Sequence, residues 1–146
     1  MNTNKLSKNN SPFRLLIDTW LPTFFWIIVV CYLSLADSGL PNIKFRFILE
    51  SDKIAHIGIY SVLTLLFIRS LVKAMLVKSI GNKLLISSLL AISFSIVMEV
   101  LQKTLTKTRQ FDLHDIYANF TGVIIGVIIF ILFKRFFLRS KSDFNA

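Results

Sequence analysis

Four long stretches free of Asp, Glu, Lys and Arg constrain this chain more than any other feature. They cover residues 19–36, 54–68, 84–98 and 116–133. A helix needs roughly 20 predominantly apolar residues to cross a bilayer, within a range of about 17–25. The first and last stretches are long enough by themselves. The middle two reach this length only with their charged flanks, whose long Lys and Arg side chains can extend to the headgroups.

The composition favours membrane insertion over a soluble core. Of the 146 residues, 54% are hydrophobic and 17% are charged, and a soluble domain of this size could not bury so much apolar surface. We therefore predict an all-α membrane protein, a four-transmembrane-helix bundle that forms a single domain over residues 1–146. A re-entrant hairpin is the alternative for the middle pair. The expected spans are 19–36, 52–72, 83–102 and 115–134, with flexible basic tails at 1–14 and 139–146.

The distribution of Lys and Arg predicts the orientation. With four spans, the N-terminus, the second loop and the C-terminus share one side of the membrane. That side holds 11 of the 17 Lys and Arg and two of the eight acids, so it carries the whole net charge of +9. Such an excess is typical of the cytoplasmic side, so both termini are expected in the cytoplasm. The charge then serves contact with anionic membrane lipid, and we expect no nucleic-acid partner.

Three of the expected helices carry a seam of polar or small residues that reaches the other, outer side of the membrane. In the second helix the seam is Asp52, His56 and Tyr60. In the third it is Ser88, Ala91, Ser95, Glu99 and Gln102, and in the fourth it is Asp112, Asp115, Asn119, Gly122 and Gly126. Each set has the spacing of one helical face. Small residues let helices approach closely, so Gly122 and Gly126 are predicted helix-packing positions.

The three seams predict one outward-facing polar cluster, because ionisable groups within a membrane face the bundle interior. Its expected ligand-binding members are Lys53, His56, Glu99, Gln102, Arg109, Asp112, Asp115 and Asn119. Two interpretations stay open. The charges could neutralise one another as structural glue, in the pairs Lys53–Glu99, His56–Asp115 and Arg109–Asp112. Alternatively, the mixture of cations, carboxylates, imidazole and amides forms a binding or catalytic site, since simple pairing would not need them all.

The chemistry of this cluster favours an anion over a metal. Lys53 and Arg109 beside His56 suit a phosphate or a carboxylate. No local H-x-x-x-H or H-E-x-x-H spacing is present, and the single Cys31 forms no disulfide framework. We therefore expect no metal and no cofactor. An imidazole with a carboxylate could also perform acid–base chemistry near neutral pH. The catalytic residues stay unknown, and the candidates are His56, Glu99 and Asp115.

The same residues form an ordered pattern in two halves. The first is D-K-x-x-H-x-x-x-Y, at Asp52, Lys53, His56 and Tyr60. The second is E-x-x-Q followed by R-x-x-D-x-x-D-x-x-x-N-x-x-G-x-x-x-G, at Glu99, Gln102, Arg109, Asp112, Asp115, Asn119, Gly122 and Gly126. This pattern resembles the VanZ-like family of small bacterial membrane proteins, over about residues 49–130. Two features depart from it: Ile57 stands where an aromatic is expected, and the loop TLTKTRQF lacks a proline.

The resemblance implies a multi-pass protein of the bacterial inner (plasma) membrane with a role in the cell envelope. The family takes its name from a protein associated with antibiotic resistance, namely to the glycopeptide teicoplanin. The main hypothesis is therefore that the cluster binds an anionic or amphiphilic envelope ligand, either lipid-linked or a glycopeptide. The first alternative is a membrane enzyme acting on a lipid-linked phosphate or a peptidoglycan precursor. The second is an accessory subunit whose polar seam is structural.

Overall fold

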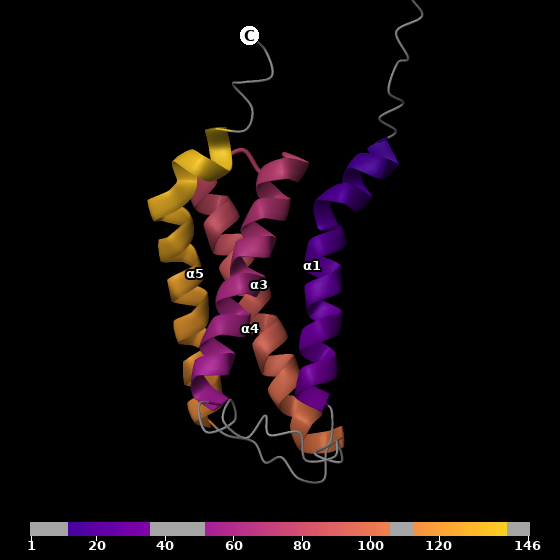
Figure 1. Cartoon of the computed structure of the whole chain (residues 1–146), viewed down its shortest axis with the longest axis vertical. Coiled ribbons are helices and arrows are strands. Elements are labelled where there is room, and N and C mark those ends of the chain that lie inside the picture. Colours follow the sequence, from indigo (N-terminus) through magenta and orange to yellow (C-terminus); the bar gives the residue numbers. More distant parts are fainter. Residues whose placement is uncertain (1–11, 36–51, 106–112, 140–146) are drawn as a thin grey trace, which may run out of the picture.

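The computed structural model describes residues 12–35, 52–105 and 113–139, and within these ranges it contains four α-helices and no strand. The helices are α1 (Pro12–Leu35), α3 (Asp52–Ala74), α4 (Ile80–Leu105) and α5 (Leu113–Arg139). They alternate in direction, so α1 begins and α5 ends at the same end of the bundle (Figure 1). We call this the terminal end, and the other the opposite end.

All four helices are long and apolar enough to cross a membrane, which confirms the predicted all-α, four-span fold. The candidate spans are Ile17–Leu35, Lys53–Ala74, Ile80–Leu105 and Leu113–Lys134. Helix α3 has 23 residues and α4 has 26, so they are roughly 35 and 39 Å long at about 1.5 Å per residue. Both run unbroken through their charged flanks. The middle pair are therefore full-length helices and not a re-entrant hairpin.

All four helices extend beyond the expected spans at one or both ends. Helix α1 begins at Pro12, inside the stretch expected as a basic tail. A proline fits the first helical turn because its ring pre-sets the backbone angle and no N–H partner is needed there. Helix α5 continues to Arg139, since no glycine or proline interrupts its last two turns. The other tail residues lie outside the described part of the chain.

Helix α3 is the centre of the bundle and packs against the other three helices, whereas α1 packs against α3 and α4 but not against α5. The closest approach is between α3 and α5, at Gly122 and Gly126. A Cβ at Gly122 would lie 2.5 Å from the Ile57 carbonyl oxygen, and one at Gly126 would lie 2.7 Å from the Ser61 carbonyl oxygen. Any larger residue would force the helices apart. The approach also lets the Ser61 hydroxyl donate to the Gly122 carbonyl at 2.9 Å.

A small apolar core fills the interior, and its buried members are Tyr60, Leu63, Phe67, Ala91 and Val123. The outward faces carry large exposed apolar side chains, such as Phe25 and Ile28 of α1. Such apolar faces are suited to contact with the hydrocarbon tails of membrane lipids. Because lipid tails are as apolar as these side chains, little hydrophobic driving force acts between helices in a membrane, and close packing and hydrogen bonds hold the bundle together.

A group of hydroxyl-centred hydrogen bonds joins α1 to α3 in the half nearer the terminal end. We call it the hydroxyl seam, and its members are Thr19, Thr23, Arg69 and Ser70. The Thr23 and Ser70 hydroxyl oxygens lie 2.9 Å apart. The Ser70 hydroxyl and the Arg69 guanidinium each donate to the Thr19 carbonyl at 3.1 Å, and the Thr23 hydroxyl donates to the Leu66 carbonyl at 3.3 Å. Three of these four bonds therefore end on a backbone carbonyl.

Candidate functional site

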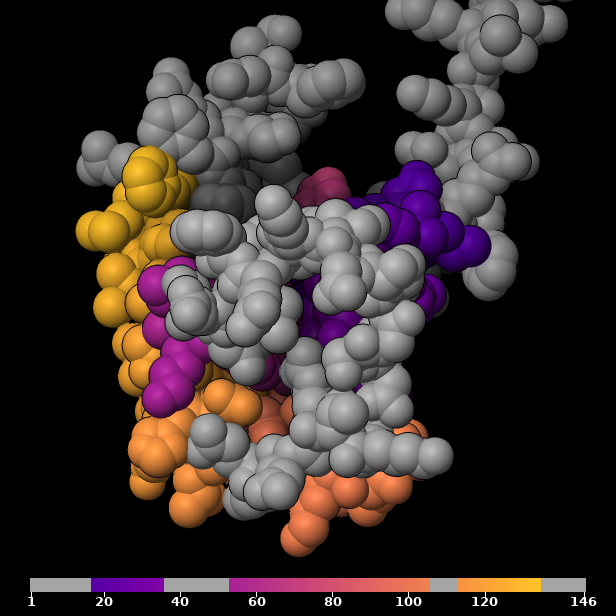
Figure 2. All heavy atoms as spheres, turned by 60° about the horizontal axis from the view of Figure 1, so that its bottom comes forward, coloured from indigo at the N-terminus to yellow at the C-terminus, as the bar shows by residue number. Residues whose placement is uncertain are grey.

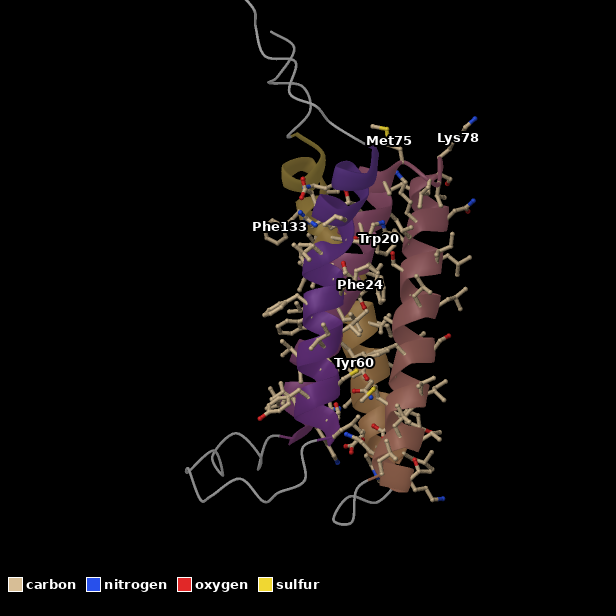
Figure 3. The ribbon with its side chains drawn as sticks, turned by 90° about the vertical axis from the view of Figure 1, so that its right-hand side faces the viewer. Trp20, Phe24, Tyr60, Met75, Lys78 and Phe133 are labelled. Carbon is tan, nitrogen blue, oxygen red and sulfur yellow. The ribbon has the colours of Figure 1, made fainter. Side chains whose placement is uncertain are left out.

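A second group of buried polar side chains lies in the half nearer the opposite end, where α3 and α5 begin and α4 ends. We call it the polar cluster, and its members are His56, Tyr60, Ser95, Glu99, Gln102 and Asn119. All six side chains are buried. Figure 2 turns this end toward the viewer and shows the start of α3 in magenta beside α5 in orange and yellow. In Figure 3 Tyr60 lies inside the bundle, far from Met75 and Lys78 at the terminal end.

A chain of side-chain hydrogen bonds runs through this cluster and links three helices. His56 Nδ1 of α3 lies 2.9 Å from Asn119 Oδ1 of α5, and Asn119 Nδ2 donates to Ser95 Oγ of α4 at 2.8 Å. Because the amide oxygen of Asn119 can only accept, Nδ1 of His56 must carry the hydrogen. A neutral His56 therefore has its acceptor at Nε2, so Asn119 selects the tautomer of the imidazole.

Tyr60 lies at the end of this chain, where its phenol is close to the side chains of Ser95 and Glu99. The hydroxyl of Ser95 thus accepts from Asn119 and also meets the phenol. Tyr60 belongs to the apolar core through its ring, and it brings the network from the cluster into that core. Its ring is tilted against that of Phe94, with centroids 6.4 Å apart, which fixes the position of the hydroxyl.

Glu99 is the most unusual member, because a carboxylate that is only 2% exposed lies within an apolar helix. A buried carboxylate is costly unless it is paired, hydrogen-bonded or protonated. One turn further along α4, Gln102 Nε2 donates to the Ser34 carbonyl of α1 at 3.1 Å. The last turn of α1 therefore also contacts the cluster, and all four helices contribute to it.

The structure brings only part of the expected ligand-binding set into the buried cluster. His56, Glu99, Gln102 and Asn119 are buried together, whereas the Lys53 side chain is exposed in the first turn of α3 and Asp115 is half-buried in the first turn of α5. The expectations for Arg109 and Asp112 lie outside the described residues. Within those residues, no three His, Cys, Asp or Glu side chains form a group that could hold a metal ion.

Three contributors, Tyr60, Ser95 and Ser34, were not among the expected ligand-binding residues. Tyr60 is on the predicted seam of the second helix. Ser95 is on the predicted seam of the third helix, and its position between Asn119 and Tyr60 makes it the centre of the hydrogen-bonded chain. Ser34 contributes through its backbone carbonyl, which every residue possesses, so no sequence signal could have identified it. The seam itself is shifted by one residue at its far end. Ser87 is buried there instead of Ser88, because Ser87, Ala91, Ser95 and Glu99 follow one another at intervals of four.

These features define a class: a four-helix, membrane-spanning bundle with a hydrogen-bonded polar cluster buried in one half. The chain belongs to the VanZ/LLP1 family, whose family model matches residues 2–134. This confirms the resemblance drawn from the two-part motif. Comparisons with curated proteins and with solved structures give no match.

Proposed function

We propose that this VanZ-like protein spans the bacterial inner membrane with both termini in the cytoplasm, and that its polar cluster faces outward and binds an anionic or amphiphilic envelope ligand. The orientation rests on the excess of Lys and Arg on the side of the termini. Among the described residues, Lys73, Lys78, Lys83 and Lys134 belong to that side. The polar cluster is in the other half of the bundle.

The observation that carries the binding proposal is the buried hydrogen-bonded chain His56–Asn119–Ser95 together with Glu99. A seam that only packs helices needs donors and acceptors, and the hydroxyl seam achieves this with Ser and Thr hydroxyls, the Arg69 guanidinium and backbone carbonyls. It does not need a carboxylate and an imidazole, whose desolvation in a membrane is costly. Retaining both at one site is the arrangement expected where a ligand or a proton is handled.

The chemistry of the ligand follows from the cations at the rim. Lys53 is exposed one turn before His56 on α3, so its ammonium can meet a ligand that approaches from the membrane surface. In this proposal Lys53 and Arg109 provide the positive charge for a phosphate or carboxylate. Glu99 and Asp115 hold Lys53 and His56 in place, and the amides of Gln102 and Asn119 provide hydrogen bonds. A glycopeptide such as teicoplanin is one ligand to test.

A second candidate function is favoured by the His56–Asn119 hydrogen bond. Because Asn119 places the hydrogen on Nδ1, a neutral His56 carries its acceptor lone pair on Nε2, which is the tautomer and fixed orientation that a catalytic histidine requires. The corresponding activity is hydrolysis or transfer at a lipid-linked phosphate or a peptidoglycan precursor. Turnover by purified protein that is lost in His56→Ala would establish the enzyme, whereas ligand binding without turnover would exclude it.

The test of the binding proposal is the melting temperature of the detergent-purified protein with and without ligands. The panel comprises teicoplanin, a polyprenyl phosphate and a lipid-linked peptidoglycan precursor. A ligand that binds only the folded state raises the melting temperature in a concentration-dependent way. We expect such a shift in the wild type and none in Glu99→Gln, which keeps the size of the side chain and removes its charge.

The matched control is Thr23→Val in the hydroxyl seam, which also keeps the size of its side chain. It should lower the melting temperature of the free protein and leave the ligand-induced shift unchanged. If no ligand shifts the wild type and Glu99→Gln melts far below Thr23→Val, the cluster is structural glue and the chain is better described as an accessory subunit.

A further inference from the structure

A lateral groove runs between α4 and α5 on the lipid-facing side of the bundle, outside the polar cluster. Its volume is about 270 Å³, and its walls include Ser88 and Ile92 of α4 and Val123, Val127 and Ile128 of α5. Phe120 and Ile124 also line it, and each of them remains about half exposed. The groove therefore opens sideways toward the bilayer and not toward water.

The packing of α5 explains why this groove exists. Gly122 and Gly126 draw α5 onto α3 until the backbones touch. Val123 and Val127 each follow one of these glycines, so they lie about 100° around the helix from the α3 contact, on the side of α4. There they line the groove together with Ser88, whose small side chain leaves the space between the two helices unfilled.

The groove points toward a cation and a phenol at the opposite end of the bundle. Lys103 lies about three helical turns beyond Ile92 on α4, and Tyr117 lies about two turns before Ile124 on α5, so each continues the face that lines the groove. The Lys103 side chain is exposed, and Tyr117 is 69% exposed. Lys and Tyr at helix ends are the side chains that meet lipid headgroups at the membrane interface.

We propose that the α4–α5 groove binds one acyl chain of an anionic phospholipid, whose phosphate lies between Lys103 and Tyr117. The apolar walls and the sideways opening select hydrocarbon. The volume holds part of one acyl chain and is too small for a further helix, and Lys103 selects a negative headgroup by charge complementarity. This site goes beyond the function proposed for the polar cluster and does not depend on it.

The test fills the groove and counts retained lipid. Detergent-purified protein is exposed to dioleoyl phosphatidylglycerol, and the lipid that stays bound is measured by native mass spectrometry. We expect one retained molecule on the wild type. Ser88→Phe should reduce retention about fivefold or more, because its ring occupies the chain's place. Ser93→Phe is the matched control, since Ser93 is on the same helix but exposed outside the groove, and it should retain lipid as the wild type does.

Two further comparisons test the headgroup and guard against misfolding. Lys103→Gln should weaken retention of phosphatidylglycerol about fivefold while leaving the smaller retention of phosphatidylcholine unchanged. Ser88→Leu fills the groove with less bulk and should lie between the wild type and Ser88→Phe. Equal retention in the wild type and both Ser88 variants, or equal loss in Ser88→Phe and Ser93→Phe, would overturn the proposal.

Competition decides between sources of the hydrocarbon chain. Displacement of phosphatidylglycerol by an equimolar polyprenyl phosphate, with the same dependence on Ser88, would overturn the assignment to a phospholipid. The Glu99-dependent melting shift is measured separately on Ser88→Phe. A normal shift there, with lipid lost from the groove, shows that the two sites are independent. Failure of one proposal is therefore distinguishable from failure of the other.

Discussion

The two buried polar regions of the bundle both join helices through hydrogen bonds, but they use different chemical groups. The hydroxyl seam joins α1 to α3 through Thr19, Thr23 and Ser70, and three of its four bonds end on backbone carbonyls. The polar cluster joins α3, α4 and α5 through side chains that bond to side chains, at His56–Asn119 and Asn119–Ser95, whereas its bond from Gln102 to α1 ends on a backbone carbonyl. A bond to a carbonyl needs only a hydroxyl of the right length. A bond between two particular side chains needs both residues, and it holds each in one orientation.

This difference separates polar groups that only stabilise a membrane bundle from polar groups that could bind a ligand. Hydroxyl groups that bond to carbonyls add modest stability, on average about 0.6 kcal/mol for an interhelical bond in a membrane protein. Oriented imidazole, amide and carboxylate groups cost more to bury and gain chemical selectivity in return. The comparison therefore predicts that variants of the seam change stability alone, while variants of the cluster change stability and ligand response together.

The largest effect is expected from Gly122→Ala, which disrupts the polar cluster and leaves the hydroxyl seam between α1 and α3 in place. Its Cβ would lie 2.5 Å from the Ile57 carbonyl oxygen, so α5 must move away from α3 and pull Asn119 from His56. We expect a loss of about 3 kcal/mol in the free energy of unfolding, at the upper end for overpacking. SDS titration in mixed micelles measures it. Gly58→Ala is the control, because nothing lies within 4 Å of that position, and a comparable loss there would contradict this account.

An intermediate effect is expected from Asn119→Ala, compared directly with Thr23→Val. Removal of the Asn119 amide takes a hydrogen-bond partner from both His56 and Ser95 in a buried site, and it should cost about 2 kcal/mol in the free energy of unfolding. Thr23→Val removes both seam bonds of the Thr23 hydroxyl and should cost about 1.2 kcal/mol, at about 0.6 kcal/mol for each bond. The same SDS titration gives both values. Equal losses would erase the distinction between the two regions.

The smallest effect, and one of opposite sign, is expected from Ser87→Ala. The Ser87 hydroxyl oxygen is buried between the two regions without a hydrogen-bond partner among the described residues. Its removal relieves an unsatisfied polar group and leaves a cavity of a single atom, so we expect a gain of about 0.5 kcal/mol. Ser95→Ala, which breaks the chain from Asn119 to Tyr60, should destabilise the protein under the same conditions. A loss in Ser87→Ala similar to that in Ser95→Ala would indicate a partner for Ser87 in the membrane.

Helix periodicity was sufficient to place His56, Glu99, Gln102 and Asn119 on inward-facing seams. A seam of polar residues on an apolar helix can only face the bundle interior, so the side of each helix follows from spacing alone. The partners did not follow in the same way. Spacing does not state that Asn119 bonds His56 on one side and Ser95 on the other, because this depends on which helices are neighbours and at what height.

By itself, the sequence determined the number of helices, the family and the inward side of His56, Glu99, Gln102 and Asn119, because apolar length and polar spacing are properties of each helix alone. Only the tertiary structure decided the exposure of Lys53, the recruitment of the Ser34 carbonyl, the hydroxyl seam and the groove between α4 and α5. The physical reason is that these features depend on distances between helices. Those distances are set by the contact of Gly122 and Gly126 with α3, and backbone carbonyls, which complete much of the hydrogen bonding, are the same at every position in a sequence.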